Sequence, residues 1–447
     1  MSSDPQLLLP AWIAPVRPAR TVLADHAVLV RGERIAAVLP RGQALAAHPH
    51  AQRIELPGQL LIPGLVNLHT HAAMALLRGC GDDLPLQRWL NERIWPLEAR
   101  LMSDEFVHDG TLLAAWELLR GGTTCINDMY FYPDAAARAA ATLGLRAVLS
   151  MVVLGFPTAY AGSPAEYLRK GLAVRDRLQD APRLSFTLAP HAPYTVPDEA
   201  FREIAVLSAE LGMPIHCHVH ETAQEVADGI RQHGVRPLAR LDALGVVTPE
   251  LIAVHAVHLN DADLDLLARR GASVAHCPHS NLKLASGIAR TADMLARGIN
   301  LGIGTDGSAS NNRLDMIAET RSAALLAKGA SGDAAAFDAH AALEAATLAG
   351  ARAVGLADRI GSIEPGKAAD LVAVDLTDED FGPLHDPVSQ LIYMCTREQV
   401  THVWIDGTLV VRNRQPTAAQ AVQAVSQVTA RVPLWQNRAV EFVPRPQ

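Results

Sequence analysis

Residues 61–71 read Leu-Ile-Pro-Gly-Leu-Val-Asn-Leu-His-Thr-His, an apolar run that closes on two histidines. The run is too short for a helix, and it predicts a buried strand. Because side chains alternate along a strand, His69 and His71 share one face while Thr70 points to the other. Two neutral imidazoles side by side can bind one divalent metal, although two hydrogen-bonded histidines at a strand end have the same spacing. The rest of the chain must decide between these interpretations.

Eight short apolar runs, of which this is the first, alternate with helical patterns. The fold class that we expect is α/β, with a closed (β/α)8 TIM-type barrel. A barrel is favoured over an open doubly wound sheet because there are eight strands and polar residues end nearly every run. The catalytic side chains of such a barrel lie at the carboxyl ends of its strands. The runs cover residues 61–69, 123–128, 146–153, 184–190, 214–220, 251–257, 272–278 and 299–306, and the helical segments include 104–120, 164–178, 198–211, 261–270 and 312–328.

Both ends of the chain carry strand patterns outside this barrel. Asp406-Gly407 between two apolar runs is a strong hairpin signal, and residues 27–39 read as a second hairpin. We therefore expect residues 1–60 and 362–447 to form a small β-sandwich. Residues 61–361 would form the catalytic barrel.

The composition excludes several classes of protein. A net charge of -8 without any run of basic residues gives no surface for nucleic acid. The apolar runs are too short to span a bilayer, so no membrane partner is expected. Five cysteines without a C-x-x-C pair argue against a disulfide framework. We expect a cytoplasmic protein that forms a homo-oligomer.

Histidines and an aspartate lie at the ends of three later runs. His216, His218 and His220 share one face of the fifth run, and spacing alone allows each of them to reach a metal. His255 ends the sixth run and Asp306 the eighth. Two histidines of the first run, one of the fifth and this aspartate would supply three nitrogen donors and one oxygen donor. Such a set suits zinc or ferrous iron, with water completing the coordination.

The motifs around these residues carry a family resemblance. Pro63-Gly64 through His71, the His218-x-x-Glu221 pair and Gly304-Thr-Asp306-Gly resemble the amidohydrolase superfamily. Within it, residues 189–194 and 281–287 are similar to the 5-methylthioadenosine/S-adenosylhomocysteine deaminases. The resemblance extends over nearly the whole chain.

The resemblance implies one divalent metal ion per chain, for which we expect Zn²⁺, with Fe²⁺ as the alternative. Relatives with two metal ions carry a bridging lysine where this chain has His191. The implied ligands are His69, His71, His218 and Asp306.

The resemblance also implies roles in catalysis and substrate binding. His255 would orient the water that the metal activates, Asp306 would accept its proton, and Glu221 would protonate the ring nitrogen next to the attacked carbon. His191 would contact a purine ring nitrogen, and Glu98 would accept hydrogen bonds from ribose hydroxyls. Glu221 and Asp306 are expected to contact the substrate as well.

The function that we predict is hydrolytic deamination of an adenosine-type nucleoside, 5'-methylthioadenosine or S-adenosylhomocysteine, with adenosine itself as a further substrate. A general acid at Glu221 favours this reaction over ester or peptide cleavage, because a protonated ring nitrogen draws charge from the carbon that is attacked. The alternatives are a guanine, 8-oxoguanine or pterin deaminase, an s-triazine chlorohydrolase, and a non-catalytic assembly scaffold. The complete ligand set argues against the scaffold. The sequence leaves open the roles of His216, His220, His258, His276 and His279.

Overall fold

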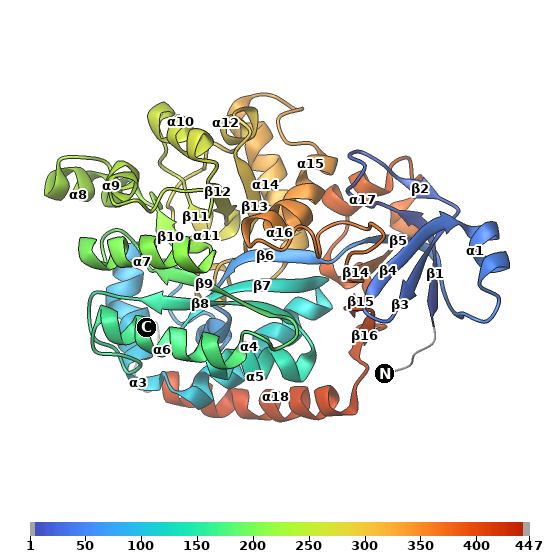
Figure 1. Cartoon of the computed structure of the whole chain (residues 1–447), viewed down its shortest axis with the longest axis horizontal. Helices are drawn as coiled ribbons and strands as arrows, with labels where there is room; N and C mark the ends of the chain where they lie inside the picture. The colour runs from blue at the N-terminus through green and yellow to red at the C-terminus, as the bar shows by residue number, and fades with distance from the viewer. Residues whose placement is uncertain (1–4, 441–447) are drawn as a thin grey trace.

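Eight parallel strands form a barrel in which the strands follow the order of the chain (Figure 1). The structure is a computed structural model that describes residues 5–440. Each of the eight predicted runs overlaps one of these strands, so the fold class is the predicted α/β barrel. The strands are β6 (Leu65–Thr70), β7 (Thr123–Tyr130), β8 (Arg146–Val153), β9 (Leu184–Pro190), β10 (Ile215–Val219), β11 (Leu251–His255), β12 (Ser273–His276) and β13 (Asn300–Ile303).

The first and last strands, β6 and β13, meet where the barrel closes. The backbone N–H of Asp306 donates to the carbonyl oxygen of His69 at 3.0 Å. The N–H of Thr305 donates to the side-chain oxygen of Asn67 at 3.0 Å, and the amide of Asn67 donates to the Thr305 hydroxyl at 2.7 Å. These bonds bring the two ends of the barrel sequence together at the carboxyl edge of the strands.

Helices connect the strands, and side-chain caps fix the start of several of them. Asn260 and Asp263 form a reciprocal capping box at the start of α10. Helix α14 begins at Met316, not at the predicted residue 312, because Asn312 ends the short helix α13 with a φ of 68° and Asp315 caps the next helix. The main barrel helices are α4 (Asp104–Arg120), α5 (Pro133–Leu143), α6 (Pro164–Leu178), α7 (Asp198–Leu211), α8 (Ala223–His233), α9 (Pro237–Ala243), α10 (Asp261–Arg270), α11 (Pro278–Lys283), α12 (Thr291–Ala296), α13 (Ser308–Asn311), α14 (Met316–Ser331), α15 (Ala339–Glu344) and α16 (Gly350–Ala353).

Both ends of the chain join in a separate nine-stranded sheet (Figure 1). Val28 from the first end and Trp404 from the second pack into one buried cluster, so the sheet folds over a shared core. Strand β1 lies outside the predicted hairpins because Pro10 interrupts its apolar pattern, and the ladder with β5 shifts register there. The strands are β1 (Gln6–Ile13), β2 (Leu23–Ala24), β3 (His26–Arg31), β4 (Arg34–Pro40), β5 (Gln52–Pro63), β14 (Leu371–Asp375), β15 (Val400–Ile405), β16 (Thr408–Arg412) and β17 (Gln415–Pro416).

The chain passes from this second sheet into the barrel at Gly64. Residues 61–63 are the end of β5 and pair with β14, so the 61–69 run holds parts of two strands and not one. A Cβ at Gly64 would lie 2.0 Å from the Thr124 hydroxyl oxygen, which leaves room for glycine alone. We infer that the barrel begins at Gly64.

Helix α18 (Ala419–Val440) lies within the segment that the sequence assigned to the second sheet, yet it runs along the barrel helices (Figure 1). Trp435 donates its indole N–H to the Asp109 carboxylate of α4 at 2.8 Å, and its ring meets that of Phe106. Pro433 inside the helix obscures its pattern in the sequence. Neither α18 nor any other helix within residues 5–440 has both the length and the apolar character needed to cross a bilayer.

Candidate metal and active site

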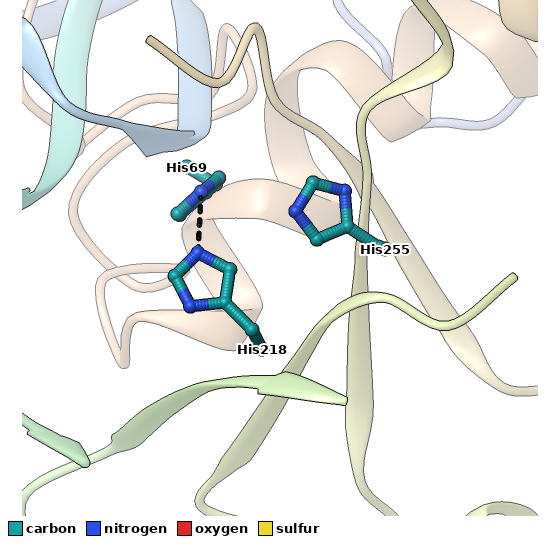
Figure 2. Close-up of side chains that lie close together, drawn as sticks. All are labelled: His69, His218 and His255. Carbon is teal, nitrogen blue, oxygen red and sulfur yellow. Dashed lines mark hydrogen bonds between the residues drawn. The ribbon is translucent and has the colours of Figure 1, made fainter. Parts of the chain in front are cut away.

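Histidines from three strands converge at the carboxyl end of the barrel. Figure 2 shows His69, His218 and His255 directed toward one another, with Nε2 of His218 lying 3.3 Å from Nε2 of His69. His69 comes from β6, His218 from β10 and His255 from β11. All three are buried, and burial lowers the pKa of His69 to about 3. The imidazole of His69 is therefore neutral, the form that can donate an electron pair to a metal.

His71 and Asp306 complete the cluster. Oδ1 of Asp306 lies 3.3 Å from Nε2 of His69 and 3.3 Å from Nε2 of His71. Tetrahedral ligands at about 2.0–2.1 Å from an ion lie roughly 3.3 Å from one another. The donor atoms are thus spaced as a zinc-sized ion requires, and His69, His71 and Asp306 form one group able to hold a metal ion.

Hydrogen bonds on the outer side of two imidazoles determine which nitrogen faces the centre. Nδ1 of His71 donates to the carbonyl oxygen of Met129 at 2.6 Å. Nδ1 of His218 donates to the carbonyl oxygen of His191 at 2.7 Å. Since Nδ1 carries the proton in each neutral ring, Nε2 presents its lone pair to the cluster.

His216, whose role the sequence left open, contacts the outer nitrogen of His69. Its Nε2 lies 2.9 Å from Nδ1 of His69, and its Nδ1 lies 3.0 Å from the hydroxyl oxygen of Ser150. Ser150 in turn lies 2.8 Å from the hydroxyl of Thr187. If Ser150 accepts from Nδ1 of His216, then Nε2 of His216 accepts the proton of His69 Nδ1. The Nε2 lone pair of His69 then points to the centre, as in the other two imidazoles.

The other histidines whose roles the sequence left open are His220, His258, His276 and His279, and three of them make contacts outside the cluster. Nε2 of His220 accepts the backbone N–H of Leu238 at 3.1 Å, so this nitrogen is occupied. His258 donates to the backbone oxygen of Ser286, and His279 pairs with Glu319. His276 is buried, and its Nδ1 has no hydrogen-bond partner among the described residues. None of these four belongs to the converging groups found within residues 5–440.

Glu221 lies beside the cluster and is almost completely buried. Burial, followed by the charge of Asp306, raises the pKa of Glu221 to about 8. The carboxyl group is therefore protonated near neutral pH, as a general acid must be. Its Oε2 lies 3.8 Å from Nε2 of His255, whose Nδ1 is held by Asn281 at 2.8 Å.

Several groups that hold the carboxylates of Glu221 and Asp306 in place were not identified from the sequence. Glu225 accepts the backbone N–H groups of His220 and Glu221 at 2.8 and 2.7 Å, and so fixes the turn that carries Glu221. The Thr222-x-x-Glu225 pattern at the start of α8 is a helix-capping signal, and it could have drawn attention to Glu225. Oδ2 of Asp306 accepts from two serine hydroxyls, at 2.6 and 2.8 Å: Ser280 and Ser310.

Two residues of the cluster have strained backbone conformations at the ends of their strands. His255 has a φ of 68° and Asp306 a φ of 60°, both in the left-handed region that residues other than glycine seldom adopt. Such conformations persist where the surrounding bonds outweigh their cost, which occurs most often at functional sites.

Comparison with known proteins agrees with this geometry. Residues 60–410 match the model of the amidohydrolase family. The chain belongs to the amidohydrolase family. Members of this family depend on a bound metal, and this amidohydrolase carries a histidine-rich site of the corresponding kind.

Relatives and a solved structure match almost the full length of this amidohydrolase. The 5-methylthioadenosine/S-adenosylhomocysteine deaminase of Teredinibacter turnerae is 46% identical over 428 residues, covering 96% of each chain. The 5'-deoxyadenosine deaminase of Methanopyrus kandleri is 43% identical and covers 89% of this chain and 92% of its own. A zinc-bound adenosine deaminase from Xanthomonas campestris is 49% identical, with a TM-score of 0.95 and 98% of each chain covered.

One continuous cavity of the amidohydrolase opens from the cluster, and its lining includes all four residues predicted to contact the substrate: Glu98, His191, Glu221 and Asp306. Glu98, on helix α3 (Trp95–Leu101), is buried and accepts the hydroxyl of Tyr130 at 2.7 Å. Burial raises the pKa of Glu98 to about 7. His191 lines the same cavity, with its Nδ1 3.0 Å from the hydroxyl of Thr195. Glu98 is thus part of the cavity wall, whereas an ordinary helix glutamate would lie on the protein surface.

Proposed function

We propose that this amidohydrolase catalyses the hydrolytic deamination of adenosine-type nucleosides, with 5'-methylthioadenosine among its substrates. The observation that carries the proposal is the shared cavity, in which a buried carboxylate, Glu98, lies along the wall from the acid Glu221 and the donor cluster. A purine at the cluster and a ribose at Glu98 would use both groups. The deaminase names of relatives over nearly the full length support the same reaction class.

One divalent ion would be held by His69, His71, His218 and Asp306, with zinc the expected metal and iron the alternative. Three nitrogen donors and one oxygen donor are typical of such a zinc site. When bound, the ion would supply Lewis-acid chemistry that lowers the pKa of a water molecule toward neutrality.

The proton balance of the reaction assigns the remaining roles. The C6–N bond breaks and a C6–O bond forms, and the two protons of water end on ring nitrogen N1 and on ammonia. Asp306 would accept a proton from the attacking water, and Glu221 would deliver one to N1 and assist the departing amine. His255, held by Asn281, would orient the water, and His191 would contact the purine.

Ammonia release tests the proposal directly. Metal-loaded protein is to be assayed with 5'-methylthioadenosine, adenosine, guanine, a pterin and an aminotriazine, with Glu221→Gln as the matched inactive control. We expect release from the adenosines to dominate and to depend on Glu221. Dominant activity on a free base or a triazine would replace the proposal with one of its rivals, and no release from any substrate would favour a scaffold.

A further inference from the structure

The lining of the substrate cavity changes in character along its length. Its ionisable side chains include four histidines and three carboxylates, which are His71, His191, His218, His255, Glu98, Glu221 and Asp306. No lysine or arginine lines the cavity within residues 5–440. The other lining groups are mainly aliphatic and aromatic, among them Leu154 and Phe131.

The apolar wall lies directly beside Glu98. Trp95 and Met102 lie three residues before and four residues after Glu98, so all three share one face of the helical segment that lines the cavity. The Trp95 ring meets the ring of Phe156 edge to face, with 5.6 Å between the centroids. We define the apolar wall as Trp95, Met102, Phe131, Leu154 and Phe156.

The position of the ribose determines what meets this wall. If Glu98 accepts the 2' and 3' hydroxyls, the 5' carbon lies only two bonds from C3' of the same sugar. A substituent on that carbon would therefore extend over the apolar wall. Burial of a thioether or a methyl group there is favourable, at about 25 cal/mol for each Å² removed from water.

Two basic residues that adjoin lining residues in the sequence already have carboxylate partners. Arg88 precedes the lining residue Trp89, and its Nε lies 2.8 Å from Glu92. Lys283 precedes the lining residue Leu284, and its Nζ lies 2.6 Å from Asp82. An α-carboxylate brought into the cavity would find no ready counter-charge on these side chains. Burying a charged group without a partner costs far more than burying an apolar group gains.

We propose that the apolar wall selects nucleosides whose 5' substituent is uncharged, and rejects those that carry an amino-acid zwitterion at the 5' sulfur. This inference rests on the proposed deaminase function and narrows it. 5'-Methylthioadenosine and 5'-deoxyadenosine would be good substrates, whereas S-adenosylhomocysteine would be a poor one. The proposal separates two compounds that the names of the relatives join.

A size-matched series separates charge from length. The metal-loaded protein is assayed for kcat/KM with 5'-methylthioadenosine, S-adenosylhomocysteine and 5'-butylthioadenosine, whose chain resembles that of homocysteine without its charges. We expect the butylthio compound to stay within roughly tenfold of the methylthio compound, and S-adenosylhomocysteine to fall by roughly 10²-fold or more. Equal rates on all three would overturn the proposal, and so would equal losses on the two long compounds, since length alone would then decide. Failure to deaminate any adenosine would refute the proposed function instead.

A gain-of-function variant tests the missing counter-charge. Phe156 is half-buried, so Phe156→Arg can place a guanidinium at the wall without burying it fully. We expect this variant to raise kcat/KM for S-adenosylhomocysteine relative to 5'-methylthioadenosine by roughly tenfold or more, while Phe156→Leu leaves that ratio low. Leu154→Arg is the second variant if the first does not fold. An unchanged ratio in a folded, metal-loaded arginine variant would contradict the proposal.

Discussion

The two ends of the substrate cavity are built on different physical principles. At the metal end, the histidines and Asp306 are held by hydrogen bonds of defined geometry, as His218 is by the carbonyl of His191 and Asp306 by two serines. At the apolar wall, Trp95 and Phe156 are positioned by packing alone among the contacts of the described residues. We therefore expect substitutions at the metal end to abolish chemistry, and those at the wall to change the choice of substrate.

The largest effect is expected from His218→Ala. Loss of one nitrogen donor should release the metal and lower turnover by roughly 10⁴-fold, as the loss of an essential catalytic element does. Metal content and ammonia release measure the two effects. Cys217→Ala is the matched control, because Cys217 precedes His218 on the opposite face of the strand and should retain metal. A metal-loaded and active His218→Ala protein would remove His218 from the ligand set.

Glu221→Gln separates chemistry from binding at the same end. The amide keeps the shape of the side chain but has no proton to give, so turnover should fall by roughly 10²-fold or more while metal remains bound. Substrate affinity, measured by calorimetry on the variant, should change little. A rate close to that of the unaltered protein would transfer the acid role to another group.

Glu98 lies between the two ends and should show an intermediate, sugar-dependent effect. Glu98→Ala should lower kcat/KM for 5'-methylthioadenosine by roughly 10²-fold but barely alter weak activity on 2',3'-dideoxyadenosine. Equal losses on both substrates would mean that Glu98 supports the fold and does not bind ribose.

The pH dependence gives an independent test of Glu98. Because its pKa is raised to about 7, the carboxylate becomes protonated as the pH falls and loses the ability to accept from the ribose. Between pH 8 and pH 6, the preference for 5'-methylthioadenosine over 2',3'-dideoxyadenosine should fall by roughly tenfold. The Glu98→Gln variant should show a flat ratio.

A smaller effect at the metal end is expected from His216→Leu. Without an acceptor for Nδ1 of His69, metal affinity should fall by roughly 10- to 100-fold, as with other residues that orient a metal ligand. Competition with a chelator measures this directly, and protein saturated with metal should recover most of its turnover. Unchanged affinity would mean that His69 does not depend on His216 for its orientation.

The smallest effect is expected at the apolar wall. Trp95→Leu removes part of the surface that a 5'-methylthio group would cover, so the preference for 5'-methylthioadenosine over adenosine should shrink by a few-fold, roughly tenfold at most. Adenosine serves as the internal control, because its 5' hydroxyl gains little from that surface. Equal losses on both substrates would show that Trp95 positions helix α3 instead.

The sequence predicted what depends on local pattern. Alternation placed His69 and His71 on one face, and the apolar runs located all eight barrel strands. Spacing could not show which of His216, His218 and His220 faces the cluster. The three histidines differ in their partners from other elements, such as Ser150 for His216 and Leu238 for His220.

Features that depend on contacts between distant parts of the chain could not be predicted either. The division of the 61–69 run at Gly64 follows from pairing with β14, which no local pattern reveals. Strand β1 and helix α18 each contain a proline that weakens their periodicity, and both are stabilised by distant segments. Glu225 carries a capping signal, but its bonds to the turn that bears Glu221 could not be read from that signal.

The closure of the barrel also has a consequence for synthesis on the ribosome. Asn67 and Thr305, which join the first strand to the last, are 238 residues apart, and Gln6 bonds to Gly407 across 401 residues. Strands β1 and β5 therefore emerge long before β14 exists to cover an exposed edge. Unpaired edges of this kind invite aggregation, and contacts between distant residues form slowly. The nascent amidohydrolase should depend on chaperones until translation is nearly complete.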